Sequence, residues 1–290
     1  MSNLSCPVCG SPLKLKYRLK FNVYKCSNCG LFNSDAKFEY SFQSSLESDS
    51  RDIGLKNLRL KNFATIIKEL RKLFGKNFNN IKGLEIGSGN GWWLQTCKEN
   101  NISCIGIEPE IIYKSYHEEN NLNVLYGFYP DVNAIQDGGY DFIIFNDVFE
   151  HIPDINDLVE NLKKDLSNDG LLIINLPMST GFFYNMATLM HKFGISSYLT
   201  RLWQFNFHSP HMNYFNDKNM KMLLNKHGLS EISALDLDSL DFPSLKERIM
   251  ADKEMNKLKA RFLTSALTLM KPVILSSKPD IKVFFFRKKL

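Results

Sequence analysis

The 290-residue sequence predicts an α/β fold, in which an open and mostly parallel sheet carries helices on both faces. Short apolar runs rich in β-branched and aromatic residues alternate along the chain with amphipathic segments of helical period. Residues 85–91 form a glycine-rich turn between two such segments, as expected where a strand leads into a helix. The first 33 residues share neither pattern, which indicates a separate small module before the α/β domain.

Four cysteines in two Cys-x2-Cys pairs dominate this first module. Cys6 and Cys9 form one pair, and Cys26 and Cys29 form the other after sixteen intervening residues. Such pairs are typical of a closed tetrahedral Zn(II) site, because each tight turn supplies two thiolates. Residues 1–33 are therefore expected to form a zinc ribbon. The metal would be its core, since so short a segment buries little apolar surface.

Disulfide bonds are the competing interpretation of these cysteines. No secretory leader precedes Cys6, and disulfides persist mainly in oxidising compartments. Cys97 and Cys104 lie in predicted core elements, where they would remain thiols. The sequence therefore favours the zinc site over two disulfides.

Residues 34–53 are rich in Ser, Asp and Phe without a helical period, and they are expected to form a linker. The α/β domain is predicted to span 54–290. It begins with an amphipathic helix, because apolar residues recur every three or four positions from Phe63 to Phe74. Further strands are predicted over 101–107, 122–126, 171–176, 229–237 and 280–287, and another begins at Tyr140. Helices are predicted over 155–167 and 217–227, and residues 244–275 are expected to form mostly helical cover.

The glycine-rich turn reads Glu85-Ile-Gly-Ser-Gly-Asn-Gly, and its glycines let the backbone turn tightly and bring N–H groups against a ligand. A dinucleotide-binding turn has the spacing G-x-G-x-x-G, whereas here the third glycine arrives one position early. An acidic residue, Glu85, also stands two positions before the first glycine. The turn resembles motif I of the class I S-adenosylmethionine-dependent methyltransferases.

Further segments resemble later motifs of the same family, in the branch that includes quinone-biosynthesis and bacterial glycan methyltransferases. The strand 101–107 ends at Glu108, the strand from Tyr140 opens into polar residues, and 171–176 matches the fifth strand. The resemblance covers about 54–290 and implies a Rossmann-like sheet of seven strands, with the last strand antiparallel between the fifth and sixth. The cysteine module resembles zinc ribbons that precede many sugar and glycan methyltransferases.

The resemblance also implies a binding site for S-adenosylmethionine. Glu85 would meet the methionine amino group, and the turn would approach the amino-acid part and ribose through Gly87, Ser88 and Gly89. Glu108, followed by Pro109, would bind the ribose diol. The methionine and sulfonium end would be lined by Asn146, Asp147 and Val148, and the adenine would lie near Phe128 and Tyr129.

Residues 178–215 form an aromatic-rich insertion after the fifth strand, which is too long for a structureless loop and is expected to be a helical lid over the acceptor pocket. Its end, from His208 to Phe215, resembles a segment at the rim of the acceptor pocket in this branch. The candidate proton acceptors are His211, His208 and His151, with His211 preferred and Tyr184 as a weaker phenolic candidate. The alternative is that these aromatics are ordinary core residues.

Taken together, these features predict a cytoplasmic S-adenosylmethionine-dependent methyltransferase with a structural Zn(II). Its expected acceptor is a small molecule, a sugar or other precursor of a bacterial surface glycan or specialised metabolite. A Rossmann dehydrogenase or a nucleotide-binding protein without chemistry are other interpretations of the turn, because fold alone determines function weakly. No apolar run approaches the ~20 residues that span a bilayer. The acceptor atom and the oligomeric state stay open.

RNA methylation is the alternative function. The net charge is +5, and the cysteine module carries five cations without an acidic residue: Lys14, Lys16, Arg18, Lys20 and Lys25. Asp147, Glu150 and His151 with a later histidine resemble the metal-binding pattern of small-RNA ribose methyltransferases. Zn(II), Mg(II) or Mn(II) could be held by such ligands. More often, however, a basic ribbon surface is solvated or meets another anion.

Overall fold

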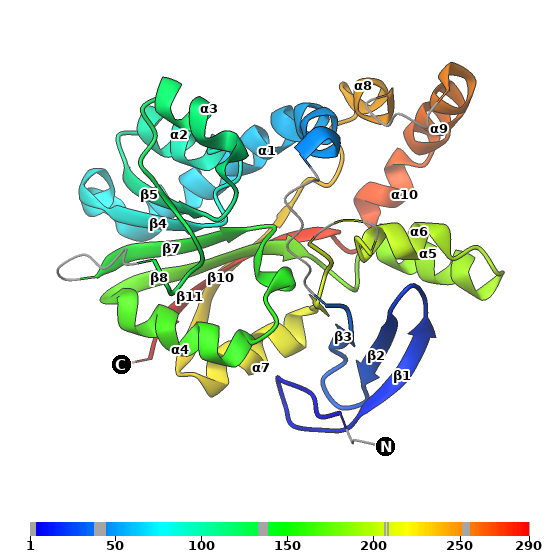
Figure 1. The fold of residues 1–290 in the computed structure, drawn as a ribbon, viewed down its shortest axis with the longest axis horizontal. Coiled ribbons are helices and arrows are strands. Elements are labelled where there is room, and N and C mark those ends of the chain that lie inside the picture. The colour runs from blue at the N-terminus through cyan, green and yellow to red at the C-terminus, as the bar shows by residue number, and fades with distance from the viewer. Residues whose placement is uncertain are drawn as a thin grey trace.

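The computed structural model describes residues 4–37, 45–132, 139–205, 207, 209–250 and 256–289. In this part of the chain, a seven-stranded sheet with helices on both faces forms the main body, and a smaller four-stranded sheet lies beside it (Figure 1). The strands of the large sheet are β4 (Lys82–Ile86), β5 (Ser103–Glu108), β6 (Val124–Tyr126), β7 (Tyr140–Asn146), β8 (Leu166–Pro177), β10 (Leu229–Leu237) and β11 (Ile281–Lys288). Their spatial order is β10-β11-β8-β7-β4-β5-β6. The predicted fold class is confirmed.

Of the described strands of the large sheet, β11 alone runs against the others. It pairs antiparallel with β8 on one side and with β10 on the other, as predicted for the last strand. β11 carries the consecutive buried residues Phe284, Phe285 and Phe286. Because side chains alternate across a strand, Phe284 and Phe286 enter the core on one face of the sheet and Phe285 enters the core on the other.

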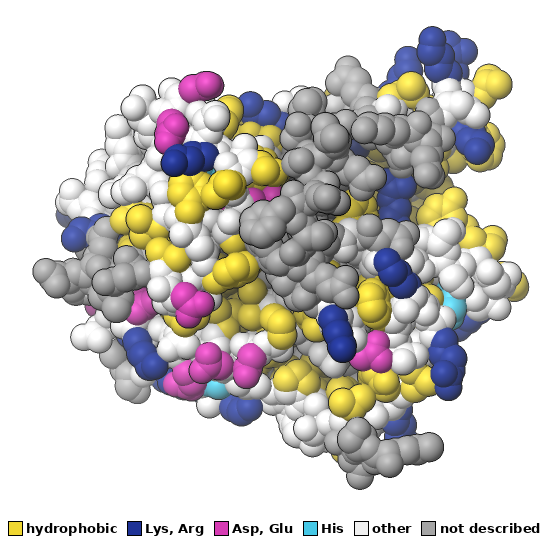
Figure 2. Space-filling view, in the orientation of Figure 1, with side chains coloured by type: hydrophobic (Ala, Val, Ile, Leu, Met, Phe, Trp, Pro, Cys, Tyr) yellow, Lys and Arg dark blue, Asp and Glu magenta, His cyan; other side chains and the backbone are white. Residues whose placement is uncertain are grey.

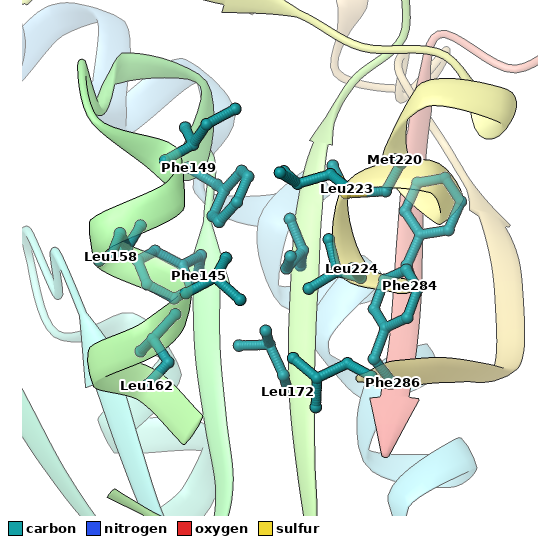
Figure 3. Packing of buried hydrophobic residues seen from close by; sticks show 14 of the residues in the cluster. Phe145, Phe149, Leu158, Leu162, Leu172, Met220, Leu223, Leu224, Phe284 and Phe286 are labelled. Atoms are coloured by element: carbon teal, nitrogen blue, oxygen red, sulfur yellow. The ribbon is translucent and has the colours of Figure 1, made fainter. Parts of the chain in front are cut away.

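Helices cover both faces of this sheet. One face packs against α1 (Ser45–Phe74) and α2 (Trp92–Glu99), with α3 (Lys114–Glu119) near the β6 edge. The other face packs against α4 (Ile155–Asp165) and α7 (Asp217–Lys226). Figure 3 shows leucines of α4 and α7 meeting phenylalanines of β7 and β11 across this second face. Full burial of each such side chain contributes about 1.5–3 kcal/mol.

α1 begins at Ser45, inside the segment predicted to be a linker. The predicted helix rested on the apolar residues that recur from Phe63 to Phe74, and these do pack in the core. Residues 45–52 are polar apart from Leu46, so they carry no apolar period that would reveal a helix. A helix can extend through such a segment once its other end is packed, because propagation costs less than nucleation.

The small sheet joins the cysteine module to the main domain. β1 (Leu13–Arg18), β2 (Asn22–Cys26) and β3 (Phe32–Ser34) form an antiparallel ribbon, and β3 also pairs with β9 (Asn213–Tyr214). β9 belongs to the end of the predicted lid. Strands about 180 residues apart in the chain therefore share one sheet, and the division into ribbon, linker and main domain stays a prediction.

The insertion after β8 is helical, as predicted, and contains α5 (Phe182–Lys192) and α6 (Ser197–Leu202). Several of its aromatic side chains pack against the ribbon, in a cluster that includes Val23, Phe32, Tyr184, Trp203 and Tyr214. These aromatics are therefore core residues, as the alternative to the lid interpretation predicted. The C-terminal helical cover consists of α8 (Leu245–Met250), α9 (Lys257–Leu269) and α10 (Lys271–Ser276).

Candidate functional site

The glycine-rich turn lies between β4 and α2, at the carboxyl edge of the sheet. Gly87, Gly89 and Gly91 all have positive φ values, of 74°, 49° and 75°. A Cβ atom on Gly87 would lie 2.6 Å from Cγ2 of Val148, so this glycine permits the turn to pack against the loop after β7. Among the described residues, a Cβ atom on Gly89 would meet nothing within 4 Å. Gly89 therefore faces open space at the turn, which leaves room for a ligand to approach the backbone.

Glu108, the last residue of β5, is buried beside this turn. Its Oε2 accepts a hydrogen bond of 2.6 Å from the backbone N–H of Gly89, and its Oε1 accepts one of 2.9 Å from that of Glu110. The carboxylate is thus fixed at the edge of the turn, with Pro109 following it in the chain. This is the position at which an open α/β sheet places the acidic residue that binds a nucleoside ribose.

Glu85 on β4 is a buried carboxyl group at the start of the turn. Its Oε1 accepts a 2.9 Å hydrogen bond from Asn146, whose own Oδ1 accepts one of 3.2 Å from Asn175. Within the described residues, Oε2 of Glu85 has no hydrogen-bond partner. Burial raises the pKa of Glu85 well above its ordinary value. An ammonium group bound at Oε2 would satisfy this atom and favour the ionised carboxylate.

Two residues that the sequence analysis missed support the turn. Nε2 of His117 on α3 donates to the carbonyl oxygen of Gly89 at 2.9 Å, while its Nδ1 lies 2.8 Å from the hydroxyl of Tyr126. Burial lowers the pKa of His117, which favours this neutral form. Arg59 on α1 lies 3.3 Å from Oδ2 of Asp147 and over the ring of Trp92. No local sequence pattern identifies either contact, because both join segments far apart in the chain.

The loop after β7 brings its predicted residues to the same edge. Asp147 has a positive φ of 57°, and its N–H donates to the carbonyl oxygen of Asn175 at 2.9 Å. Val148 follows it against Gly87.

The prediction for Tyr129 needs correction. Its hydroxyl donates to Asp165 at the end of α4, at the opposite end of the sheet from the turn, so of the predicted adenine pair only the exposed Phe128 remains.

Beside this loop, Glu150, His151 and His211 form a compact cluster. Glu150 and His151 belong to the short helix η3 (Phe149–His151), and His211 comes from the end of the lid insertion. Oε1 of Glu150 lies 4.0 Å from Nε2 of His151 and 3.8 Å from Nε2 of His211. The two imidazole rings are 4.6 Å apart in an edge-to-face arrangement. A buried carboxyl group between two imidazoles is suited to accept and hold one proton.

Hydrogen bonds orient both imidazoles. Nδ1 of His151 donates to the carbonyl oxygen of Pro210 at 3.0 Å, which leaves its Nε2 basic and directed at Glu150. The side-chain amide nitrogen of Gln204 lies 2.9 Å from Nε2 of His211 and donates to it, so this Nε2 also carries the lone pair. The carbonyl oxygen of His211 accepts from the hydroxyl of Ser34, which connects the cluster to the ribbon.

The predicted proton acceptors therefore differ in their placement. His151 and His211 meet in one cluster, and His208 lies outside the described residues. Tyr184 is buried in the contact between α5 and the ribbon, and burial raises its pKa well above the ordinary value. A hydroxyl so hard to ionise is a poor proton acceptor, which disfavours Tyr184.

The same cluster offers one oxygen and two nitrogen ligands, all within 4.8 Å of one another. Such a set suits Zn(II) and other first-row divalent cations. Asp147, which the predicted metal pattern included, is not among these residues. Its carboxylate faces Arg59 instead.

The four cysteines of the ribbon form a second cluster. Sγ of Cys6 lies 3.5 Å from Sγ of Cys29, and Sγ of Cys9 lies 3.4 Å from Sγ of Cys26. All four are free thiols, and their separations exceed the ~2.05 Å of a disulfide. Four sulfurs this close fit a tetrahedral Zn(II) with bonds of about 2.3 Å. The geometry suits zinc and disfavours the competing interpretation of two disulfides.

We expect one zinc ion per chain that survives exhaustive dialysis, because four thiolates close the coordination shell. Metal analysis of the purified protein measures it. Cys26→Ser should lose the zinc, whereas Cys104→Ser, which removes a thiol in β5, should keep it. A dialysed protein without zinc, in which alkylation detects two disulfides, would contradict this assignment.

Comparison with known proteins indicates which family shares this arrangement. A family described as "Methyltransferase domain" matches residues 58–234. Among curated proteins, the malonyl-[acyl-carrier protein] O-methyltransferase of Bacillus anthracis is 26% identical over 124 residues. The match covers 41% of this chain and 45% of that protein, so the chain aligns with less than half of the relative's length.

Solved structures share the fold at low sequence identity. A chain from the complex between the Haloferax volcanii Trm112 methyltransferase activator and the putative methyltransferase has a TM-score of 0.55 and 13% identity, over 88% of this chain and 100% of that one. A possible histamine N-methyltransferase from Thermotoga maritima has a TM-score of 0.54 and 14% identity, over 86% and 97%. The plantazolicin methyltransferase BpumL in complex with SAH has a TM-score of 0.55 and 14% identity, over 87% and 92%.

Proposed function

We propose that this chain, which belongs to the family of methyltransferase domains, methylates a hydroxyl group of a small molecule. The chain is an S-adenosylmethionine-dependent methyltransferase, since the family match covers more than half of it. The proposal concerns the acceptor, a sugar or other precursor of a surface glycan or specialised metabolite. It rests on one observation, the cluster of buried Glu150 and His211 with half-buried His151 beside the glycine-rich turn.

The residues at the turn fit S-adenosylmethionine as donor. The buried Oε2 of Glu85 suits the methionine ammonium group, and the open space beside Gly89 suits close approach to the backbone. Glu108 is placed for the ribose diol, where ribose hydroxyls would compete for oxygens that now accept from backbone N–H groups. S-adenosylmethionine supplies a methyl group that is already activated by its sulfonium sulfur. The protein therefore needs no nucleophile of its own.

Proton removal is the remaining requirement, because a sugar hydroxyl is a weak nucleophile until it loses its proton. In our proposal, Nε2 of His211 accepts the hydroxyl proton after the acceptor replaces the amide of Gln204. The acceptor oxygen forms a bond to the methyl carbon while the sulfur–methyl bond breaks and its electron pair stays on sulfur. The products are a methyl ether, a neutral thioether and a protonated imidazole, whose Nε2 lies 3.8 Å from the carboxyl group of Glu150.

A labelling screen tests this acceptor class. Purified protein with methyl-labelled S-adenosylmethionine would be offered nucleotide sugars, malonyl-acyl carrier protein and RNA in parallel. We expect a methyl ether on a nucleotide sugar or a related small molecule. Label found only in malonyl-acyl carrier protein would contradict the proposal, because a carboxylate acceptor is ionised at neutral pH and needs no proton acceptor. Label only in RNA would favour the second candidate.

The second candidate function is metal-assisted methylation of RNA ribose. One observation favours it, the convergence of Glu150, His151 and His211 into a possible ligand set for a divalent cation. In the same screen, this candidate requires that chelation abolishes labelling of RNA and that Mg(II) or Mn(II) restores it while zinc stays in the ribbon. Labelling of a small molecule that withstands the chelator rules it out. The engagement of Asp147 with Arg59 weighs against it, because the predicted pattern needs that carboxylate.

A further inference from the structure

The outer face of α9 and α10 is apolar and open to solvent. Leu258, Phe262 and Leu269 on α9 are 78%, 77% and 82% exposed, and Val273 and Leu275 on α10 are exposed as well. Positions 258, 262 and 269 recur at intervals of four and seven, so they form one stripe along α9, and α10, which follows directly in the chain, adds Val273 and Leu275. Isolated exposed apolar residues are common on proteins, but a continuous stripe of large ones indicates a binding surface.

Packing among the described residues does not account for this stripe. The opposite face of α9 already forms a small core, in which Ala260, Leu263 and Leu267 pack with Leu245 and Ile249 of α8. α9 therefore has two apolar faces, one used for folding and one unused among the described residues. Figure 1 shows α9 and α10 at the margin of the molecule, outside the two faces of the large sheet.

The stripe is bordered by positive charge. Residues 256–279 contain five cations and no acidic residue, and all five cations are exposed: Lys257, Lys259, Arg261, Lys271 and Lys278. Figure 2 shows basic and hydrophobic side chains gathered together at the end of the molecule where α9 lies. A short helix with large exposed apolar residues on one side and lysines and arginines beside them is typical of helices that lie in a membrane interface.

We propose that this face, formed by the exposed residues of α9 and α10 named above, binds the surface of an anionic lipid bilayer. The apolar side chains would enter the boundary between headgroups and acyl chains, and the cations would contact anionic headgroups. A second copy of the chain is the other partner that could cover this apolar face. Charge disfavours it, because dimerisation through this face would bring two sets of five cations together.

The attachment would be superficial. Among the described residues, no helix combines the length and the apolar character that crossing a bilayer requires. The proposal does not depend on which acceptor is methylated. It would place the enzyme at a surface where lipid-attached as well as free acceptors are found.

Vesicle sedimentation tests the proposal with the full-length protein. We expect binding to vesicles of phosphatidylcholine mixed with phosphatidylglycerol, weaker binding to phosphatidylcholine alone, and loss of the difference at high salt. Phe262→Glu combined with Leu269→Glu should weaken binding by at least about tenfold, because two large apolar groups no longer leave water. Lys259→Glu with Arg261→Glu should remove the preference for anionic vesicles.

Ile111→Glu is the matched control, since it changes an equally apolar residue that is 62% exposed on η2 (Ile111–Tyr113), far from α9 along the chain. It should bind vesicles like the wild type. Unchanged affinity of the Phe262 and Leu269 variant for S-adenosylmethionine would show that this variant is folded. Absence of wild-type binding to anionic vesicles would overturn the proposal. Concentration-dependent dimerisation that the same variant abolishes would assign the face to a second copy instead.

Discussion

Gly89→Val is expected to lower the affinity for S-adenosylmethionine by more than about 100-fold, or about 2.7 kcal/mol. Two effects add. The valine side chain would occupy the open space that a ligand must enter, because a Cβ atom at this position has no neighbour within 4 Å in the described part of the chain. A β-branched residue also resists the positive φ of 49°, at a cost of about 1–2 kcal/mol for the left-handed conformation. Calorimetry with the donor or its demethylated product measures the change.

Gly228→Val is the control that separates these effects. Gly228, between α7 and β10, has a φ of 76°, and a Cβ atom on it would likewise have no neighbour within 4 Å among the residues that the structure describes. This variant should lose a similar amount of stability and keep its donor affinity.

Glu108→Ala should weaken donor binding by about 10- to 100-fold, since charge-assisted hydrogen bonds to the ribose would be lost and partly replaced by water. Normal affinity in the Gly89 variant would refute the donor site proposed at this turn.

The large sheet could be predicted from sequence because each of its signals is local. The apolar runs from Leu229 and through Phe284 show a period and composition that mark strands, and β10 has the predicted boundaries. Glycine spacing in the turn, with an acid two positions before it, predicted the strand-to-helix junction at Glu85. Four motifs in register were enough to indicate the family fold, and that resemblance placed the last strand antiparallel between the fifth and sixth.

The supporting contacts of the site could not be predicted, because they depend on tertiary structure. His117 reaches Gly89 and Arg59 reaches Asp147 only after segments 28 and 88 residues apart have packed. The hydroxyl of Tyr129 finds Asp165 rather than the donor edge for the same reason. The pairing of β3 with β9 also has no local signal. A two-residue strand is too short to show a period.

This last pairing changes how the ribbon can be understood. Ser34 of the ribbon donates two hydrogen bonds of 2.9 Å to successive carbonyl oxygens of the insertion after β8, those of His211 and Met212. Asn216 and Asn219, which cap α7, donate to the carbonyl oxygen of Cys29. The cysteine knuckles are thus tied to the segment that presents His211. In our proposal the ribbon positions the proton acceptor, whether or not it also binds a partner.

His211→Ala is expected to lower single-turnover rates by about 10²- to 10⁴-fold at saturating donor, because general-base catalysis contributes on that scale. Donor affinity should stay nearly constant, since the turn and Glu108 are untouched. His191→Ala is a matched control. It removes a histidine of the same insertion whose Nδ1 contacts Ser196, away from the cluster, and its turnover should be close to normal.

Because His211 is buried, a slower variant alone would not separate chemistry from altered packing. Two further measurements do. If Nε2 of His211 accepts the proton, free imidazole should partly restore turnover in the alanine variant, and the rise of rate with pH expected for the wild type should flatten. A structural role predicts neither result. Turnover near the wild-type level in His211→Ala would move proton removal to His151 or to the substrate itself, since His151 holds the other basic nitrogen 4.0 Å from Glu150.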